Sequence, residues 1–366
     1  SLAKWVDANS ARISPLLCKL CPQTHYNTAH YFYNRTHISI KVFMNGFASS
    51  LLASVLLASI PLIVAGMGEL LAEKSGVLNL GVEGMMLLGA VSAFAVALNT
   101  GNASLGMLAG TLVGGLAALL FAFLVLRLLT NQTATGLALT ILGTGLSALF
   151  GVKYVGLSVT GFAPVAIPFL SELPLVGELF NQSMPAYLGI ALCVVFGILL
   201  FKSKFGLTVR AVGESPSVAH AIGYDVLKIR YAMTVLGGAM AGFAGAFVAL
   251  VQFKAWQEGI TGGVGWIAVA LVVFATWHPA RLILGALLFG LMRSLGFAVQ
   301  AANQPIQDWL VDQSGWMKAL ASFMTNVQVL NALPYVATVV VLCWISRDWR
   351  KIRMNAPMSL SQPFLP

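Results

Sequence analysis

The residues that most strongly suggest chemistry lie in one polar, glycine-rich run between two apolar segments. Within this run, residues 73–86, one amide, Asn79, and one carboxylate, Glu83, stand among the glycines 76, 81 and 84. Closely spaced glycines break a helix, and membranes tolerate the freed backbone only where protein or a water-filled path satisfies it. A carboxylate at membrane depth costs a few kcal/mol, so it is normally paired or functional. Two roles stay open for Asn79, Gly81, Glu83 and Gly84: structural pairing, or a place along a solute path.

Two other patterns place unusual residues inside apolar segments. Arg293 stands in the middle of one such segment. It faces a pathway, faces a partner subunit or extends to an interface, and the sequence does not choose among these. Glycines also recur at every fourth residue in residues 106–114 and again at residues 238 and 242, which lets helix backbones approach closely. This device suits packing within one subunit, or a seam between subunits.

The polar segment 202–230 predicts a short surface helix. Ser215 followed by Pro216 is typical of a helix N-cap and first position, and Gly223 is typical of a C-terminal stop. We therefore expect a helix over residues 216–222, lying along the membrane surface. Its basic flanks suit docking into another protein, and equally suit a solvated connector that only anchors topology.

Common catalytic equipment is missing from the sequence. No lysine follows a glycine, so no phosphate-binding loop occurs, and neither H-E-x-x-H nor G-x-S-x-G is found. Cys18 and Cys21 form a single C-x-x-C without a second pair, which does not predict a zinc site. We expect no cofactor and no metal on this chain, and any ATP hydrolysis must take place on another chain.

Composition indicates the solvent in which these residues are positioned. The 366 residues are 58% hydrophobic and only 9% charged, and the mean hydropathy is +0.85. Soluble proteins carry about a quarter charged residues, so the chain is predicted to be an all-α, polytopic integral membrane protein. The net charge of +9 does not indicate nucleic-acid binding, because the basic residues gather in short loops.

Apolar runs predict about nine membrane-crossing segments, since a bilayer core needs about 20 apolar residues per helix. The seventh and ninth are short, and are expected to be tilted into protein or partly re-entrant. The predicted segments are 46–72, 80–100, 104–126, 134–152, 186–201, 231–251, 263–277, 282–300 and 332–346.

Basic residues predict the orientation, because Lys and Arg are retained on the cytoplasmic side. The segment 202–230 carries five of them and is assigned to the inside. Alternation then places Lys74, Arg127, Arg281 and the basic residues of 347–353 inside as well. The C-terminus is therefore predicted to be cytoplasmic.

The chain is expected to have three parts. Residues 1–43 are polar, hold three of the five histidines and contain no long apolar run. We expect them to be a disordered or non-native extension before Met44, whose removal leaves transport unchanged. Residues 44–354 form the transmembrane domain, and residues 355–366 form a tail.

Four stretches carry a resemblance to a known family: 72–90, 135–151, 204–246 and 355–364. They look like the permease subunits of nucleoside and simple-sugar ABC importers, in the superfamily of branched-chain amino acid permeases. The resemblance implies that the helix at 216–222 is a coupling helix that engages a cytoplasmic ATPase. The positions that match the family's loop motif are Arg210, Gly213, Glu214, Ala221 and Gly223.

The resemblance also implies a prokaryotic inner membrane and several partners. These are a second homologous permease chain, a cytoplasmic ABC ATPase and an external solute-binding protein, for which the long outer segments 153–185 and 301–331 offer a surface. Nucleosides are the first expected cargo, followed by simple sugars and then branched-chain amino acids. Two rival classes remain: a membrane-embedded enzyme, which needs convergent titratable groups, and an ion-gradient-driven secondary transporter. The latter needs several intramembrane charges, and only Glu69, Glu83 and Arg293 qualify.

Overall fold

The structure is a computed structural model that describes residues 26–171, 173, 176–301, 315–330, 332–333, 336 and 355–365. The chain divides into two compact units, Ser1–Ser50 and Leu51–Pro366. Residues 1–25 of the predicted extension lie outside the described residues, and helix α2 (Tyr26–Lys74) begins within that extension. The second unit contains both regions singled out from the sequence, the glycine-rich run and the polar segment 202–230.

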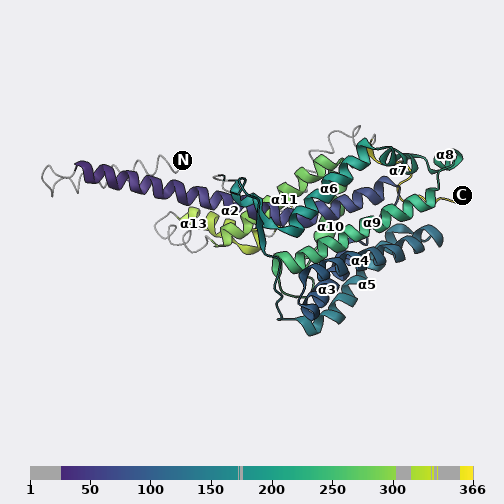
Figure 1. Cartoon of the computed structure of the whole chain (residues 1–366), viewed down its shortest axis with the longest axis horizontal. Coiled ribbons are helices and arrows are strands. Elements are labelled where there is room, and N and C mark those ends of the chain that lie inside the picture. The colour runs from purple at the N-terminus through teal and green to yellow at the C-terminus, as the bar shows by residue number, and fades with distance from the viewer. Residues whose placement is uncertain are drawn as a thin grey trace. The chain divides into compact units, whose positions relative to one another are not determined.

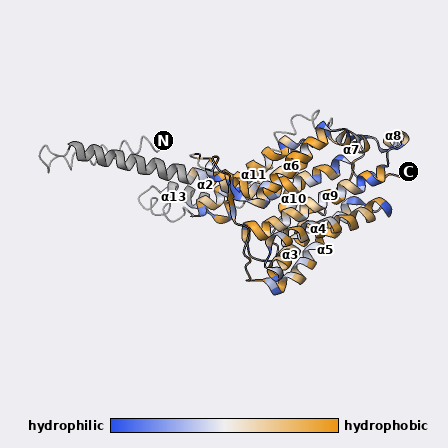
Figure 2. Ribbon diagram, viewed as in Figure 1, coloured by the Kyte–Doolittle hydropathy of each residue, from blue (hydrophilic) through white to orange (hydrophobic). Residues whose placement is uncertain are grey.

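Long apolar helices make up most of the second unit, which confirms the all-α membrane prediction (Figure 1). Figure 2 shows hydrophobic residues along most of their length. Among the described residues, seven helices are long and apolar enough to cross a membrane, and they match the first six predicted segments and the eighth to within a few residues. Four of them are single helices or parts of one: Ala48–Lys74 in α2, α3 (Val82–Thr100), α6 (Met184–Lys202) and Pro279–Gln300 in α11 (Pro279–Ala301). The other three continue into a short turn of another helix type: α4 (Ala103–Ala122) into the π-turn η1 (Phe123–Arg127), α5 (Gln132–Gly151) into the 3-10 turn η2 (Val152–Tyr154), and α9 (Val226–Phe247) into the π-turn η4 (Val248–Phe253).

The other two predicted segments have different outcomes. The seventh, 263–277, contains only the 11-residue helix α10 (Val264–Phe274). At about 1.5 Å per residue α10 reaches roughly half of a 30 Å hydrocarbon core, in keeping with the prediction that this segment is short. The ninth, 332–346, lies almost entirely outside the described residues.

Glycines bring the backbones of α3, α4 and α9 into contact. A Cβ atom on Gly114 would lie 2.5 Å from the Gly238 carbonyl oxygen, and one on Gly242 would lie 2.3 Å from the Gly110 carbonyl oxygen. Both distances are shorter than a side chain tolerates, so glycine is needed on each side of the α4–α9 crossing. The spacing of these glycines therefore serves packing within one subunit.

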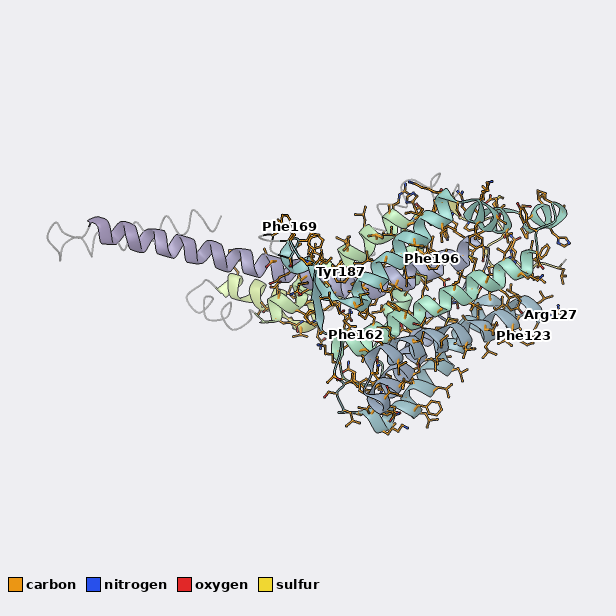
Figure 3. All side chains as sticks on the ribbon, viewed as in Figure 1. Phe123, Arg127, Phe162, Phe169, Tyr187 and Phe196 are labelled. Carbon is orange, nitrogen blue, oxygen red and sulfur yellow. The ribbon has the colours of Figure 1, made fainter. Side chains whose placement is uncertain are left out.

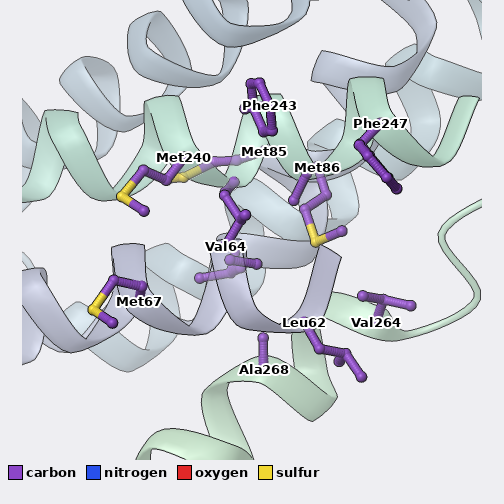
Figure 4. Close-up of a cluster of buried hydrophobic side chains, with 14 of the residues drawn as sticks. Leu62, Val64, Met67, Met85, Met86, Met240, Phe243, Phe247, Val264 and Ala268 are labelled. Carbon is purple, nitrogen blue, oxygen red and sulfur yellow. The ribbon is translucent and has the colours of Figure 1, made fainter. Parts of the chain in front are cut away.

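The core beside this crossing is built from large apolar side chains of four helices, α2, α3, α9 and α10 (Figure 4). Met67 of α2, Met85 of α3 and Phe247 of α9 are completely buried. The flexible methionines fill the irregular space that remains between helices of unequal spacing. By contrast α4 turns large apolar residues outward, at a spacing that suits contact with lipid: Leu105, Leu108, Leu112, Leu116 and Leu119.

The long segment between α5 and α6 carries a small hairpin. Strands β1 (Pro164–Ala166) and β2 (Asn181–Ser183) pair antiparallel, and the 3-10 turn η3 (Gly177–Phe180) precedes β2. Tyr187 at the start of α6 lies against the hairpin (Figure 3), where its hydroxyl donates to the Val165 carbonyl at 3.1 Å. Only residues 315–330 of the second long segment are described without gaps, and they include α13 (Gly315–Thr325).

Candidate functional site

The chain between α2 and α3 is unwound where the glycine-rich run predicted a break. α2 ends at Lys74 and α3 begins at Val82. Gly76 has a φ of +94°, in the left-handed region that other residues rarely adopt. A Cβ atom there would also lie 2.7 Å from both Arg230 Nη2 and Ser359 Oγ. Glycine is therefore required at this turn on two grounds.

Protein groups satisfy the backbone that the unwinding releases, as a broken element in a membrane requires. Asn79 is buried, and its side-chain oxygen accepts a hydrogen bond from Gly81 N at 3.0 Å. Side chains of two neighbouring helices complete the pairing: Leu78 N donates to Gln132 of α5 (2.8 Å), Leu80 O accepts from Thr140 of α5 (3.0 Å), and Asn79 N donates to Glu69 of α2 (3.0 Å).

Glu83 joins this break to a second one, at the start of α10. Its carboxylate accepts hydrogen bonds from Gly265 N at 2.6 Å, from Gly263 N at 3.0 Å and from the Thr261 hydroxyl at 2.5 Å. These amides are the unpaired donors of the first turn of α10, where the helix dipole also favours a negative charge. Glu83 thus acts as a capping group supplied by another helix, which favours its structural role.

α10 is a half-length helix that begins inside the bundle. Gly262 and Gly263 have φ values of 55° and 82°, so the chain reverses just before the helix starts. A Cβ atom on Gly265 would lie 2.6 Å from the Glu83 backbone. The helix therefore starts packed against the beginning of α3, and the turn that follows it lies beside Glu73 at the end of α2.

Gly81 and Gly84 set the distance between α3 and α5. A Cβ atom on Gly84 would lie 2.6 Å from the Leu139 carbonyl oxygen and 2.7 Å from the Thr140 Cα, which are backbone atoms that cannot move aside. At Gly81 the nearest atom is a Leu139 methyl group at 2.9 Å. Of the two glycines, Gly84 therefore holds the tighter contact.

Two further carboxylates lie one helical turn apart at the end of α2. Glu69 and Glu73 are fully buried, and Glu73 accepts a hydrogen bond from the Trp277 indole, in the turn between α10 and α11. Each carboxylate also has one oxygen with no hydrogen-bond donor among the described residues. The pair ties α2 both to the unwound run, through Asn79, and to the far end of α10.

The polar segment 202–230 contains two helices. The predicted short helix is α8 (Pro216–Ala221), and Gly223 has the left-handed φ of +98° expected of a C-terminal stop. Its N–H donates to His220 O at 2.9 Å, and Tyr224 N donates to Ala219 O at 3.1 Å, which closes the helix end. The amphipathic helix α7 (Lys204–Glu214) precedes it and was not predicted.

The five loop-motif residues have different surroundings. Gly213 is buried, and a Cβ atom on it would lie 2.2 Å from the Lys74 carbonyl oxygen, so α7 touches the end of α2 there. Glu214, the last residue of α7, is exposed, as are Ala221 at the end of α8 and Gly223 just after it. The half-buried Arg210 lies over the Phe201 ring at 5.2 Å from its centroid.

Known proteins match nearly the whole of the second unit. The family of branched-chain amino acid transport system permease components matches residues 51–342. The chain belongs to this permease family.

Individual relatives agree with this assignment. A Haloferax volcanii protein, provisionally named a glucose ABC transporter permease, is 41% identical over 87% of this chain and 98% of its own length. A guanosine ABC transporter permease of Bacillus subtilis is 31% identical over 87% and 97%. A nucleoside ABC transporter permease of Lactococcus lactis is 31% identical over 80% and 90%. No solved structure matches the chain. The protein is thus a transmembrane permease subunit of an ABC importer.

Arg293 of the permease lies on α11. It is half-buried, and its guanidinium is 5.9 Å from the centroid of the Phe297 ring, one turn along the same helix. Stacking on an aromatic face is a common way to accommodate a guanidinium in apolar surroundings.

Arg230 and Ser359 connect the permease's polar regions, and neither was predicted from the sequence. Arg230 was assigned to the solvated basic loop, but it lies in α9 and is 0% exposed. Its Nε donates to Ser75 O at 3.1 Å, and its Nη2 donates to Ser359 Oγ at 3.0 Å. The resemblance of residues 355–364 to the family was the one signal that this tail has a packed role.

Proposed function

We propose that α8 is the element through which this permease engages a separate cytoplasmic ATPase. The observation that carries the proposal is that α8 is anchored on one side and uncovered on the other. Ala219 packs into a small apolar cluster with Val212 and Val226, whereas Val218 and Ile222 are 56% and 71% exposed. Exposed apolar residues on a capped helix suit burial in a partner's cleft.

In this proposal the chain hydrolyses no ATP and holds no cofactor and no metal ion. It pairs with a second homologous permease chain, and the two enclose the solute path. The unwound run and α10 suit alternating access, because transporters commonly place broken helices where one part of the molecule moves against another around the solute site. We place α7, α8 and the C-terminus on the cytoplasmic side of a prokaryotic inner membrane, which puts the basic ends of α2 and α4 inside.

Relatives support a small, hydroxyl-bearing cargo delivered by an external solute-binding protein. Two of them are named for nucleosides or guanosine and one for glucose. We propose nucleosides as the first candidate. Simple sugars are the second, because the glucose-named relative shares 41% identity.

Reconstitution in proteoliposomes tests both the mechanism and the cargo. The permease would be combined with the ATPase, second permease and binding-protein subunits of its importer, and uptake of labelled guanosine and glucose would be followed with and without ATP. We expect uptake only with ATP and the ATPase, and preferentially of the nucleoside. Preferential glucose uptake would reassign the cargo. Uptake driven by an ion gradient, without the ATPase, would instead make the protein a secondary transporter.

A further inference from the structure

The end of the chain forms a strap, residues 355–365, across the inner ends of two helices. Ser359 donates twice to the Gly213 carbonyl at the end of α7, from its N–H at 3.1 Å and from its hydroxyl at 2.6 Å. Ser361 N donates to Gly76 O at 3.3 Å, and Lys74 Nζ donates to Asn355 O at 2.7 Å. The strap is therefore hydrogen-bonded both to the polar segment 202–230, at Gly213, and to the unwound run, at Gly76.

Arg230 holds the strap in place with a buried guanidinium. Its Nη1 and Nη2 donate to the strap, to Gln362 O at 3.1 Å and Ser359 Oγ at 3.0 Å, while its Nε donates to Ser75 O in the unwound run at 3.1 Å. No carboxylate lies within ion-pair distance of Arg230 in the described part of the chain. A planar guanidinium carries its donors on three nitrogens in a fixed fork and so reaches acceptors on separate segments at once, whereas a lysine donates from a single nitrogen.

The far end of the strap supports α8 from beneath. Phe364 packs against the apolar cluster of Val212, Ala219 and Val226, and its ring meets the His220 ring edge-on at 5.8 Å. The exposed face of α8 is thus backed by a continuous set of contacts that runs through the strap to Ser75 and Gly76.

We propose that the strap carries movements of α8 to the unwound run, with Arg230 and Ser359 as positioning residues that set how tightly ATP hydrolysis is coupled to transport. The unwound run continues into Glu83, which holds the start of α10. A shift of α8 therefore reaches both broken elements through packed side chains and hydrogen bonds rather than through flexible loops. This inference rests on the proposed docking of the ATPase at α8, and it adds a role that does not involve contact with the ATPase.

The test compares uptake per ATP hydrolysed in reconstituted complexes. Ser359→Ala removes the hydroxyl that joins Arg230 to Gly213. We expect it to insert and to retain the ATPase, while uptake per ATP falls by about tenfold, the change expected on losing one hydrogen bond to a charged group. Arg230→Lys keeps the positive charge but loses the planar set of guanidinium donors. It should lower the uptake per ATP hydrolysed further.

Two matched controls should leave the ratio unchanged. Gln362→Ala changes the strap, but Arg230 binds the backbone carbonyl of Gln362, so its bonds remain. Arg127→Lys makes the same substitution at an exposed arginine.

An unchanged ratio in Ser359→Ala would overturn the inference. Loss of the ATPase together with uptake would also overturn it, because the strap would then only maintain the docking surface. If the unmodified permease failed to bind the ATPase, the proposed function itself would fall.

Discussion

Two regions of this permease differ in how they are packed: the centre of the bundle, where the unwound run meets α3, and the coupling segment, residues 202–230. In the centre, around Glu83 and Gly84, backbones touch and polar groups are paired inside the bundle. At α8, the glycine stop has nothing within 4 Å of its Cβ position, and the apolar residues Val218 and Ile222 are exposed. Gly84 thus serves close packing, whereas Gly223 serves backbone conformation. A substitution should therefore disturb assembly of the chain in the first region and attachment of a partner in the second.

The largest effect is expected from Gly84→Leu. Its side chain would meet the backbone of Leu139 and Thr140 at less than 3 Å, and overpacking costs about 1–3 kcal/mol or more when backbone must move. We expect little folded protein by size-exclusion chromatography in detergent, with a smaller loss for Gly81→Leu. Gly145→Leu on α5 is the control, because nothing lies within 4 Å of its Cβ position. Normal yield of the Gly84 variant would show that the α3–α5 contact is loose.

Gly223→Val should impair attachment of the ATPase without impairing folding of the permease. A β-branched residue at a φ of +98° carries about 1–3 kcal/mol of backbone strain, so the end of α8 should change direction. We expect normal insertion but loss of ATPase co-purification and uptake, with a milder loss for Glu214→Lys. Gly101→Val offers a matched control, since Gly101 is also left-handed (φ +68°) and open, but ends α3. If both coupling variants retained the ATPase and transported normally, α8 would be a topology anchor only.

Glu83→Gln should produce an intermediate effect within the centre. The amide retains one acceptor oxygen, but its NH2 group would face a donor in either orientation, Gly265 N on one side or Gly263 N and the Thr261 hydroxyl on the other. An unsatisfied buried donor costs about 1–3 kcal/mol, so we expect a lower melting temperature and slower uptake with the ATPase still bound. An unchanged melting temperature would mean that the carboxylate charge does not hold α10.

The smallest effect is expected at Asp225, the exposed N-cap of α9. Its side chain accepts from Lys228 N at 3.1 Å and pairs with Lys228 Nζ at 2.9 Å, and these hydrogen bonds lower the pKa of Asp225. A lowered folded-state pKa means that this contribution is present above the ordinary value near 4 and is lost as pH falls through the folded-state pKa. Melting curves of Asp225→Asn and the unmodified protein should differ slightly at pH 7 and converge as the pH falls below the folded-state pKa of Asp225. A difference that did not shrink as the pH was lowered would contradict this origin.

The sequence alone determined the features that depend on local chemistry. Long apolar runs predicted the crossing helices, closely spaced glycines predicted the break before α3, and the Ser215, Pro216 and Gly223 pattern predicted α8. These inferences succeeded because hydropathy, helix breaking and capping are decided within about one helical turn or one bilayer thickness.

Only the tertiary structure decided what each polar residue meets. An apolar run does not reveal where a helix begins, so the sequence did not show that α10 is a half-length helix capped by Glu83, about 180 residues away in the chain. Arg230 resembled a solvated topology signal because it follows a basic loop. Its acceptors in the unwound run and the strap lie 155 and 129 residues away. A charge is stable at such a buried position only when the folded chain brings its acceptors together.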